Sequence, residues 1–290
     1  MRKAVMMLST VLLAGGVLAG CGDSGEKTGN GQEAAQTAAP AVQGADLSAE
    51  VAAYREFVLE QQDQFLLETQ KFVDAVKAGD MEQAKAIYPQ ARMYFERSEP
   101  VAEVFGELDP KIDGRLADLE EEGKGKEEWS GYHKLEYGLW VEQTTSGYEP
   151  VADQLLAHVK ELRAKVETVD VTAELMINGA VDLLNEVSTS KITGEEEIYS
   201  HTDLYDFKAN IEGAEKIFTI FQPKLESKDA KLTASLQASF QKVNELLAKY
   251  EDGKGGYLSY EALTPANTKE LSEAVDQLGE PLSQMAIVVE

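Results

Sequence analysis

The feature that most constrains the fold is the spacing of apolar residues after position 47, which recur mostly at three- and four-residue steps. In the first such segment the residues in this register are Tyr54, Phe57, Val58, Gln61, Phe65, Phe72 and Val76. The spacing places them on one face of a helix, because an α-helix has 3.6 residues per turn. No segment alternates convincingly with a period of two, so the sequence predicts an all-α fold.

Capping signals divide this region into helices. Ser48 is a candidate N-cap, Gly79 ends the first helix, and Asp80 caps the second. The expected helices cover residues 48–78, 80–105 despite a proline at 100, 127–143, 150–166, 172–187, 203–221, 232–250 and 267–288. About eight helices in this length suit two packed four-helix bundles, or one bundle with a duplicated plan.

The N-terminus has the composition of a bacterial export signal. Arg2 and Lys3 precede an apolar run, residues 4–20, that is too short and too rich in small residues for a good membrane-spanning helix. The run ends in the sequence LAGC, which resembles the lipobox of bacterial lipoproteins, with Cys21 as the lipidated residue. Because Cys21 is the only cysteine, the chain offers neither a disulfide nor a thiolate metal site.

The segment after Cys21 cannot bury a core, because Val42 is its only bulky apolar residue up to position 45. We therefore expect a signal peptide over residues 1–20, a lipidated cysteine and flexible linker over 21–46, and a helical domain over 47–290. The mature protein should lie outside the cytoplasm, anchored to the bacterial cell membrane as a lipoprotein.

The charge balance limits the partners of this chain. It contains 27 Lys plus Arg against 52 Asp plus Glu, a net charge of −25. Such a chain repels phosphate backbones, which argues against nucleic-acid binding. An acidic surface also raises the local concentration of cations, including metal ions.

One histidine motif carries candidate chemistry. In WSGYHKLEYGLW, His133 and Glu136 are three residues apart and so lie on one face of the expected helix. The pair could hold a metal ion, but the spacing alone favours a structural role slightly. No second histidine lies four residues from His133, as a zinc protease helix would require.

Acidic residues flank this motif at a distance in sequence. Glu96 and Glu99 are three apart on the expected second helix, Asp113 follows in a loop, and GEEE supplies glutamates downstream. With a histidine they would form an oxygen-rich site that suits ferric iron, calcium or manganese better than copper(I). On composition alone, the simpler interpretation is that these glutamates are an exposed acidic edge and a solvated run.

Three motifs taken together, GYHKLE, YFERSEPVAEVFGELDPKID and KITGEEEIYSHTDLYDFKANIEGA, resemble the imelysin-like domain of the EfeO and EfeM iron-uptake lipoproteins. The likeness covers nearly the whole chain after the linker. It implies a pair of four-helix bundles and a component that binds iron and delivers it. Its implied partners are an oxidase-type iron permease and a secreted haem peroxidase. Peptide cleavage is not implied, although the family is named after a peptidase.

The resemblance also implies a metal site. Its residues would be Glu96, Glu99, Asp113, His133 and a glutamate of the GEEE run, with Glu196 preferred over Glu195 and Glu197. Glu136 belongs to the signature and would either bind the metal or orient His133. The implied cargo is ferric or ferrous iron, with zinc or another divalent cation as a substitute in vitro. Longer members carry an N-terminal cupredoxin domain, whereas only the linker precedes the helices here, so the chain resembles the short form.

The sequence is also compatible with two other functions. One is a metallopeptidase of the imelysin type, against which the lack of an identifiable general base argues. The other is a cation-dependent polysaccharide-binding lipoprotein. The net negative charge disfavours direct capture of a polyanion unless cations bridge the two.

Overall fold

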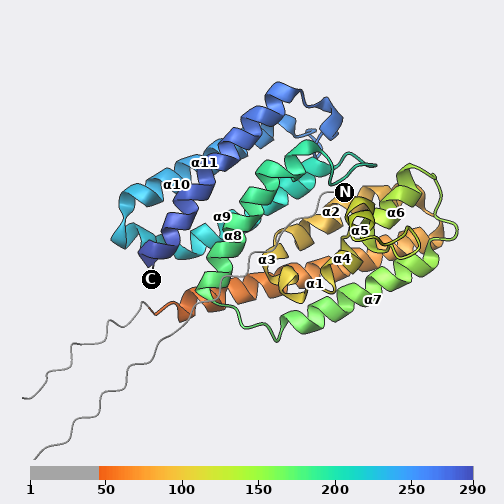
Figure 1. Ribbon diagram of the computed structural model, residues 1–290, viewed down its shortest axis with the longest axis horizontal. Helices are drawn as coiled ribbons and strands as arrows, with labels where there is room; N and C mark the ends of the chain where they lie inside the picture. The colour runs from red at the N-terminus through yellow and green to blue at the C-terminus, as the bar shows by residue number, and fades with distance from the viewer. Residues whose placement is uncertain (1–45, 290) are drawn as a thin grey trace, which may run out of the picture. The chain divides into compact units, whose positions relative to one another are not determined.

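A computed structural model describes residues 46–289 of the 290-residue chain (Figure 1). The α-helices are α1 (Ser48–Ala78), α2 (Met81–Glu96), α3 (Glu99–Ala102), α4 (Asp109–Ile112), α5 (Leu116–Glu121), α6 (Gly131–Trp140), α7 (Glu149–Val166), α8 (Ala173–Thr189), α9 (Asp203–Lys228), α10 (Ala230–Leu247) and α11 (Pro265–Val289). Short 3-10 turns are η1 (Glu103–Phe105), η2 (Lys191–Thr193), η3 (Ala248–Tyr250) and η4 (Tyr260–Ala262). In this range the only β-type pairing is one isolated bridge, between Glu251 and Tyr257. The all-α prediction is confirmed.

The long helices form two bundles, as predicted. Helices α1, α2, α6 and α7 pack against one another, and so do α8, α9, α10 and α11 (Figure 1). The bundles meet chiefly where α2 packs against α9. Between residues 46 and 289 no helix combines the length and apolar character needed to span a bilayer. The predicted signal peptide, Cys21 and nearly all of the predicted linker lie outside the described residues.

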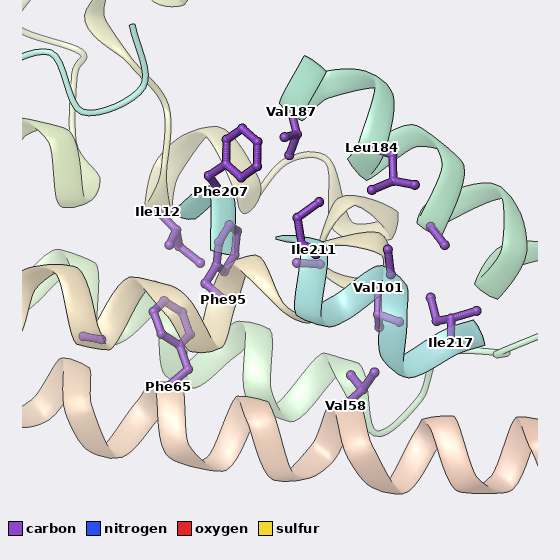
Figure 2. Packing of buried hydrophobic residues seen from close by; sticks show 14 of the residues in the cluster. Val58, Phe65, Phe95, Val101, Ile112, Leu184, Val187, Phe207, Ile211 and Ile217 are labelled. Carbon is purple, nitrogen blue, oxygen red and sulfur yellow. The ribbon is translucent and has the colours of Figure 1, made fainter. Parts of the chain in front are cut away.

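One continuous apolar core runs through both bundles. Phe95 of α2 lies between Phe65 of α1, with ring centroids 5.3 Å apart, and Phe207 of α9 (Figure 2). Val101 and Ile211 continue this contact between α3 and α9 (Figure 2). All five side chains are buried, which fixes α2 and α9 against each other.

The second predicted helix is shorter than expected. Residues 80–105 are not continuous, because α2 ends at Glu96 and a new turn begins at Glu99. The hydroxyl of Ser98 donates to the carbonyls of Tyr94 and Phe95, and Pro100 has no N–H to continue the helix. The break lies between Glu96 and Glu99, which are both predicted metal ligands, so the two residues do not belong to one continuous helix.

The predicted helix start near residue 127 is also wrong, since α6 begins at Gly131. Gly131 has a φ of +85°, and a Cβ there would lie 2.3 Å from the carbonyl oxygen of Ile112. Only glycine fits this backbone and this close approach. The contact brings the start of α6 against the end of α4, so that His133 lies beside Asp113.

Candidate metal site

A stripe of polar residues on α2 faces the interior. Tyr88, Arg92 and Glu96 follow one another at four-residue steps, and Glu99 comes three residues later. Glu96 is 0% exposed and Glu99 is 6% exposed. The alternative that these glutamates form an exposed acidic edge is therefore wrong.

Arg92 lies at the centre of the site, with 1% exposure. Its guanidinium is surrounded by the carboxylates of Asp113, Glu96 at 2.8 Å, Glu197 at 2.5 Å, Asp206 at 3.4 Å and Glu196 at 3.6 Å. Burial lowers the pKa of Arg92, but these carboxylates raise it well above its usual value. The guanidinium therefore keeps its charge and joins residues from α2, α9 and the loops after α4 and η2.

A second buried cation organises one side of the site, which we call the lysine group (Glu96, Glu99 and Lys191). The Nζ of Lys191 lies 2.7 Å from Glu96 Oε2 and 3.4 Å from Glu99 Oε2. Asn210 of α9 donates to the same two carboxylate oxygens at 3.0 and 2.9 Å. Burial raises the pKa of Glu96, but Lys191 and Arg92 outweigh it and hold this pKa at about 2. Burial raises the pKa of Glu99 well above its usual value.

The other side of the site is the histidine group (Asp113, His133 and Glu196). One side-chain donor atom from each of these residues lies within 4.8 Å of the others. The Nε2 of His133 lies 3.6 Å from Asp113 Oδ1 and 4.0 Å from Glu196 Oε1. Although His133 is 2% exposed, its Nε2 has no hydrogen-bond partner among the described residues. A buried nitrogen between two carboxylates is suitably placed for a cation ligand.

Glu136 holds the imidazole in position. Its Oε2 lies 3.1 Å from His133 Nδ1, and its Oε1 accepts the backbone N–H groups of Tyr199 at 3.0 Å and Ser200 at 2.7 Å. When Nδ1–H donates to Glu136, the neutral ring presents its Nε2 lone pair to Asp113 and Glu196. Burial and Arg92 lower the pKa of His133, but Glu136 and Asp113 raise it, and the net shift is upward.

The GEEE run does not behave as a solvated stretch. Glu195 is exposed, but Glu196 is 7% exposed and Glu197 is 0% exposed. Glu197 accepts from Ser200 Oγ at 2.9 Å, and its backbone N–H donates to Asp203 Oδ1 at 3.1 Å. The carboxylate of Asp203 thus fixes this loop.

The structure brings all six predicted metal-site residues into one buried region. Within it, Asp113, His133 and Glu196 converge on one point, whereas Glu96 and Glu99 face Lys191. The donor atoms of His133, Glu136 and Glu197 also lie close enough together to hold an ion. However, the carboxylate of Glu136 already accepts hydrogen bonds from two backbone N–H groups. The predicted lipidation residue Cys21 lies outside the described residues.

Four residues of this region were not predicted from the sequence. Arg92 and Lys191 supply positive charge, Asp206 is a further acid that contacts Arg92, and Asn210 donates hydrogen bonds to Glu96 and Glu99. A signal for two of these was available on α9, where Asp206 and Asn210 follow Asp203 at helical spacing. Arg92 was detectable in the same way, four residues before Glu96 on one helix face. Lys191 carries no such signal, because it comes from the turn η2 and reaches the site only through the packing of α8.

The buried acids outnumber the buried cations in this region. The two groups contain four acids, and the carboxylates of Glu136, Glu197, Asp203 and Asp206 are buried near them. Among residues 46–289, the buried Arg and Lys side chains of this region are Arg92 and Lys191. Burial raises the pKa of Asp206 well above its usual value, although Arg92 opposes this. Excess buried negative charge is costly unless protons or a cation compensate it, so the site favours cations.

Comparisons with known proteins identify the family of this chain. A family model described as imelysin matches residues 50–285. An Efem/EfeO family lipoprotein of Staphylococcus haemolyticus (strain JCSC1435) is 54% identical over 289 residues, which cover 98% of this chain and 99% of that protein. Another, from Staphylococcus aureus (strain MSSA476), is 58% identical over 247 residues, 85% of this chain and 87% of that protein. The chain therefore belongs to the imelysin family and, within it, to the Efem/EfeO lipoproteins.

Proposed function

We propose that this protein is the lipid-anchored, extracytoplasmic iron-binding component of an iron uptake system. The observation that carries the proposal is the buried Nε2 of His133, which has no partner among the described residues and faces the carboxylates of Asp113 and Glu196. Two carboxylates and one imidazole suit iron, because they combine hard oxygen donors with one nitrogen.

In this proposal the members of the site have different roles. Asp113, His133 and Glu196 bind the ion, and Glu136 orients the imidazole through Nδ1. Glu96, whose pKa is held low, adds negative charge near the site, and Glu96 and Glu99 would each have to leave Lys191 to become a ligand. Their assignment as ligands remains a prediction.

The lipid anchor and the partners are also part of the proposal. The relatives are named lipoproteins, and the alignment with the Staphylococcus haemolyticus protein spans 98% of this chain, which supports lipidation of Cys21. The Efem/EfeO name supports delivery to an iron permease, with a haem peroxidase as the third component. Both partners follow from the family resemblance and await a direct interaction experiment.

Iron titration tests the proposal. The purified protein should bind ferric or ferrous iron in a saturable manner, and Asp113→Asn should weaken this binding. Asp153→Asn is a matched control, because Asp153 is an exposed acid of α7 that pairs with Lys77 of α1. Failure of the parent protein to retain iron, or equal affinities of both variants, would contradict the proposal.

The peptidase name of the family requires a separate assay. His133 lies in the site, whereas His201 pairs with Glu261 at 3.8 Å and His158 lies on α7. A zinc peptidase activates water with a general base, and every acid around His133 Nε2 is engaged with Arg92 or serves as a proposed ligand. We expect no peptide turnover by the zinc-loaded protein; measurable turnover would revive the metallopeptidase alternative.

A further inference from the structure

A cavity of about 350 Å³ adjoins the histidine group. His133 and Glu196 form part of its wall, and apolar side chains from α5 and two loops form another part: Leu116, Trp129, Ile198 and Tyr199. Six liquid waters would occupy roughly 180 Å³. The cavity is thus larger than a hydrated ion requires, and its apolar wall is poorly matched to water.

An ion in the histidine group would have coordination positions that face this cavity. Asp113, His133 and Glu196 offer one donor atom each. A six-coordinate ion held by three protein atoms keeps about three open positions. Because the cavity is bordered by His133 and Glu196, a ligand that occupies those positions would also contact the apolar wall.

One apolar residue of this wall, Ile198, is exposed, which is evidence for an organic ligand. Ile198 is 53% exposed, although it follows two buried glutamates of the site. Trp129 is buried beside it, with Nε1 donating to the Gly114 carbonyl at 2.7 Å, and its ring lies 6.4 Å from the ring of Tyr199. Aromatic and aliphatic side chains around a few polar groups are typical of small-molecule sites.

The charges around the cavity determine which iron complexes it can attract. Asp118, Glu121 and Glu195 line it together with Glu196. Arg115 does not reverse this charge, because Asp118 accepts two of its hydrogen bonds at 2.8 Å. An iron complex with several free carboxylates would be repelled, whereas a complex with net positive charge would be attracted.

We propose that the cavity receives the organic part of an iron complex, namely one small aromatic chelator that binds ferric iron through two oxygen atoms and leaves the complex positively charged. The inference rests on the proposed iron-binding function and names its substrate class. On binding, Asp113, His133 and Glu196 replace water molecules on the ion, and the chelator keeps both of its bonds. No electron is transferred.

The test offers ferric iron to the full-length protein in detergent as its one-to-one complex with benzohydroxamate, with acetohydroxamate, or as ferric citrate. Retained hydroxamate is read from its charge-transfer absorbance after gel filtration, and iron is measured separately. The protein should retain iron and benzohydroxamate together, about tenfold more tightly than acetohydroxamate, because the two share their oxygens but differ in the apolar group. Iron taken from citrate should arrive without citrate.

Two matched variants locate the effect. Ile198→Ser should reduce the preference for benzohydroxamate to about threefold or less, because it removes an apolar contact without changing charge. Ile287→Ser, at a position 82% exposed that does not line the cavity, should keep the full preference.

The possible failures are distinguishable. Iron retained without hydroxamate, equal retention of the two hydroxamates, or retention of citrate would overturn the chelator inference and leave the iron-binding proposal standing. Absence of iron from the protein with every source would overturn both.

Discussion

The lysine group and the histidine group contain the same kind of acids, but their cations come from different sources. In the lysine group, Lys191 lies 2.7 Å from Glu96, and Asn210 completes the hydrogen bonds. In the histidine group, His133 Nε2 stays 3.6 Å from Asp113 and has no hydrogen-bond partner within residues 46–289. The chain thus supplies Lys191 to the acids of the lysine group, whereas in our proposal the histidine group, beside the cavity, binds an external ion.

Arg92 joins the two groups. Its guanidinium contacts Glu96 on one side and Asp113 on the other. Because the acids around it hold its pKa high, it remains charged and holds both carboxylates in place. We therefore expect that substitutions in the lysine group mainly lower the stability of the fold, whereas substitutions in the histidine group mainly weaken iron binding.

The largest effect should follow removal of the internal cation. Lys191→Met should lower the free energy of unfolding by about 3–5 kcal/mol, because Glu96 and Glu99 remain buried without their partner. Chemical denaturation measures this loss. Lys71→Met is the matched control, since Lys71 is half exposed and pairs only with Glu68; it should cost less than about 1 kcal/mol. Similar losses in the two variants would contradict the assigned role of Lys191.

His133→Ala should show the reverse pattern. We expect iron affinity to fall at least about 100-fold, because the nitrogen ligand is lost, with a smaller effect on stability than Lys191→Met. Isothermal titration and denaturation of the same sample would separate the two effects. His158→Ala removes a histidine that contacts neither group and should bind iron like the parent; an equal loss there would show that the effect is not specific.

Glu136→Gln tests whether Glu136 orients the imidazole of His133 or binds the ion itself. The amide keeps the size of the side chain but can present its NH₂ group to His133 Nδ1 or to the backbone N–H groups of residues 199 and 200. We expect iron affinity to fall about 10–100-fold, less than in His133→Ala. A loss larger than that of His133→Ala would indicate that Glu136 itself binds the ion.

The smallest effect is the pH dependence of binding. Burial raises the pKa of Asp113, although Arg92 opposes it, and the pKa of His133 also lies above its usual 6.5. Protons on these groups compete with the ion, so affinity falls as the pH falls through these pKa values. At pH values below these pKa values the loss should approach about tenfold per pH unit for each competing proton. His133→Ala should show a shallower slope, and an affinity independent of pH would contradict the ligand assignment.

Much of the fold followed from sequence because helical periodicity and caps are local signals. Thr172, for example, accepts the N–H of Leu175 at the predicted start of α8. The errors occurred where distant contacts decide the local structure. The break after Glu96 depends on Ser98, which also accepts from Gln62 of α1 at 2.9 Å, and the start of α6 depends on the carbonyl of Ile112.

The site was predictable only in part, for a related reason. The family motifs pointed to Glu96, Glu99, Asp113, His133 and Glu196, and the structure brings these together. Their division into two groups could not be predicted, because it depends on Lys191 and Asn210, which approach from η2 and α9. Composition also misled for Glu196 and Glu197, since acidic runs are usually solvated and these two are buried.

The most direct test of the central claim is the position of the bound ion, measured by anomalous diffraction at the iron edge from crystals loaded with iron. We expect a single peak within bonding distance of His133 Nε2, Asp113 and Glu196, with Lys191 still beside Glu96. A peak between Glu96 and Glu99 with Lys191 displaced would contradict it, as would loaded crystals without a peak at His133.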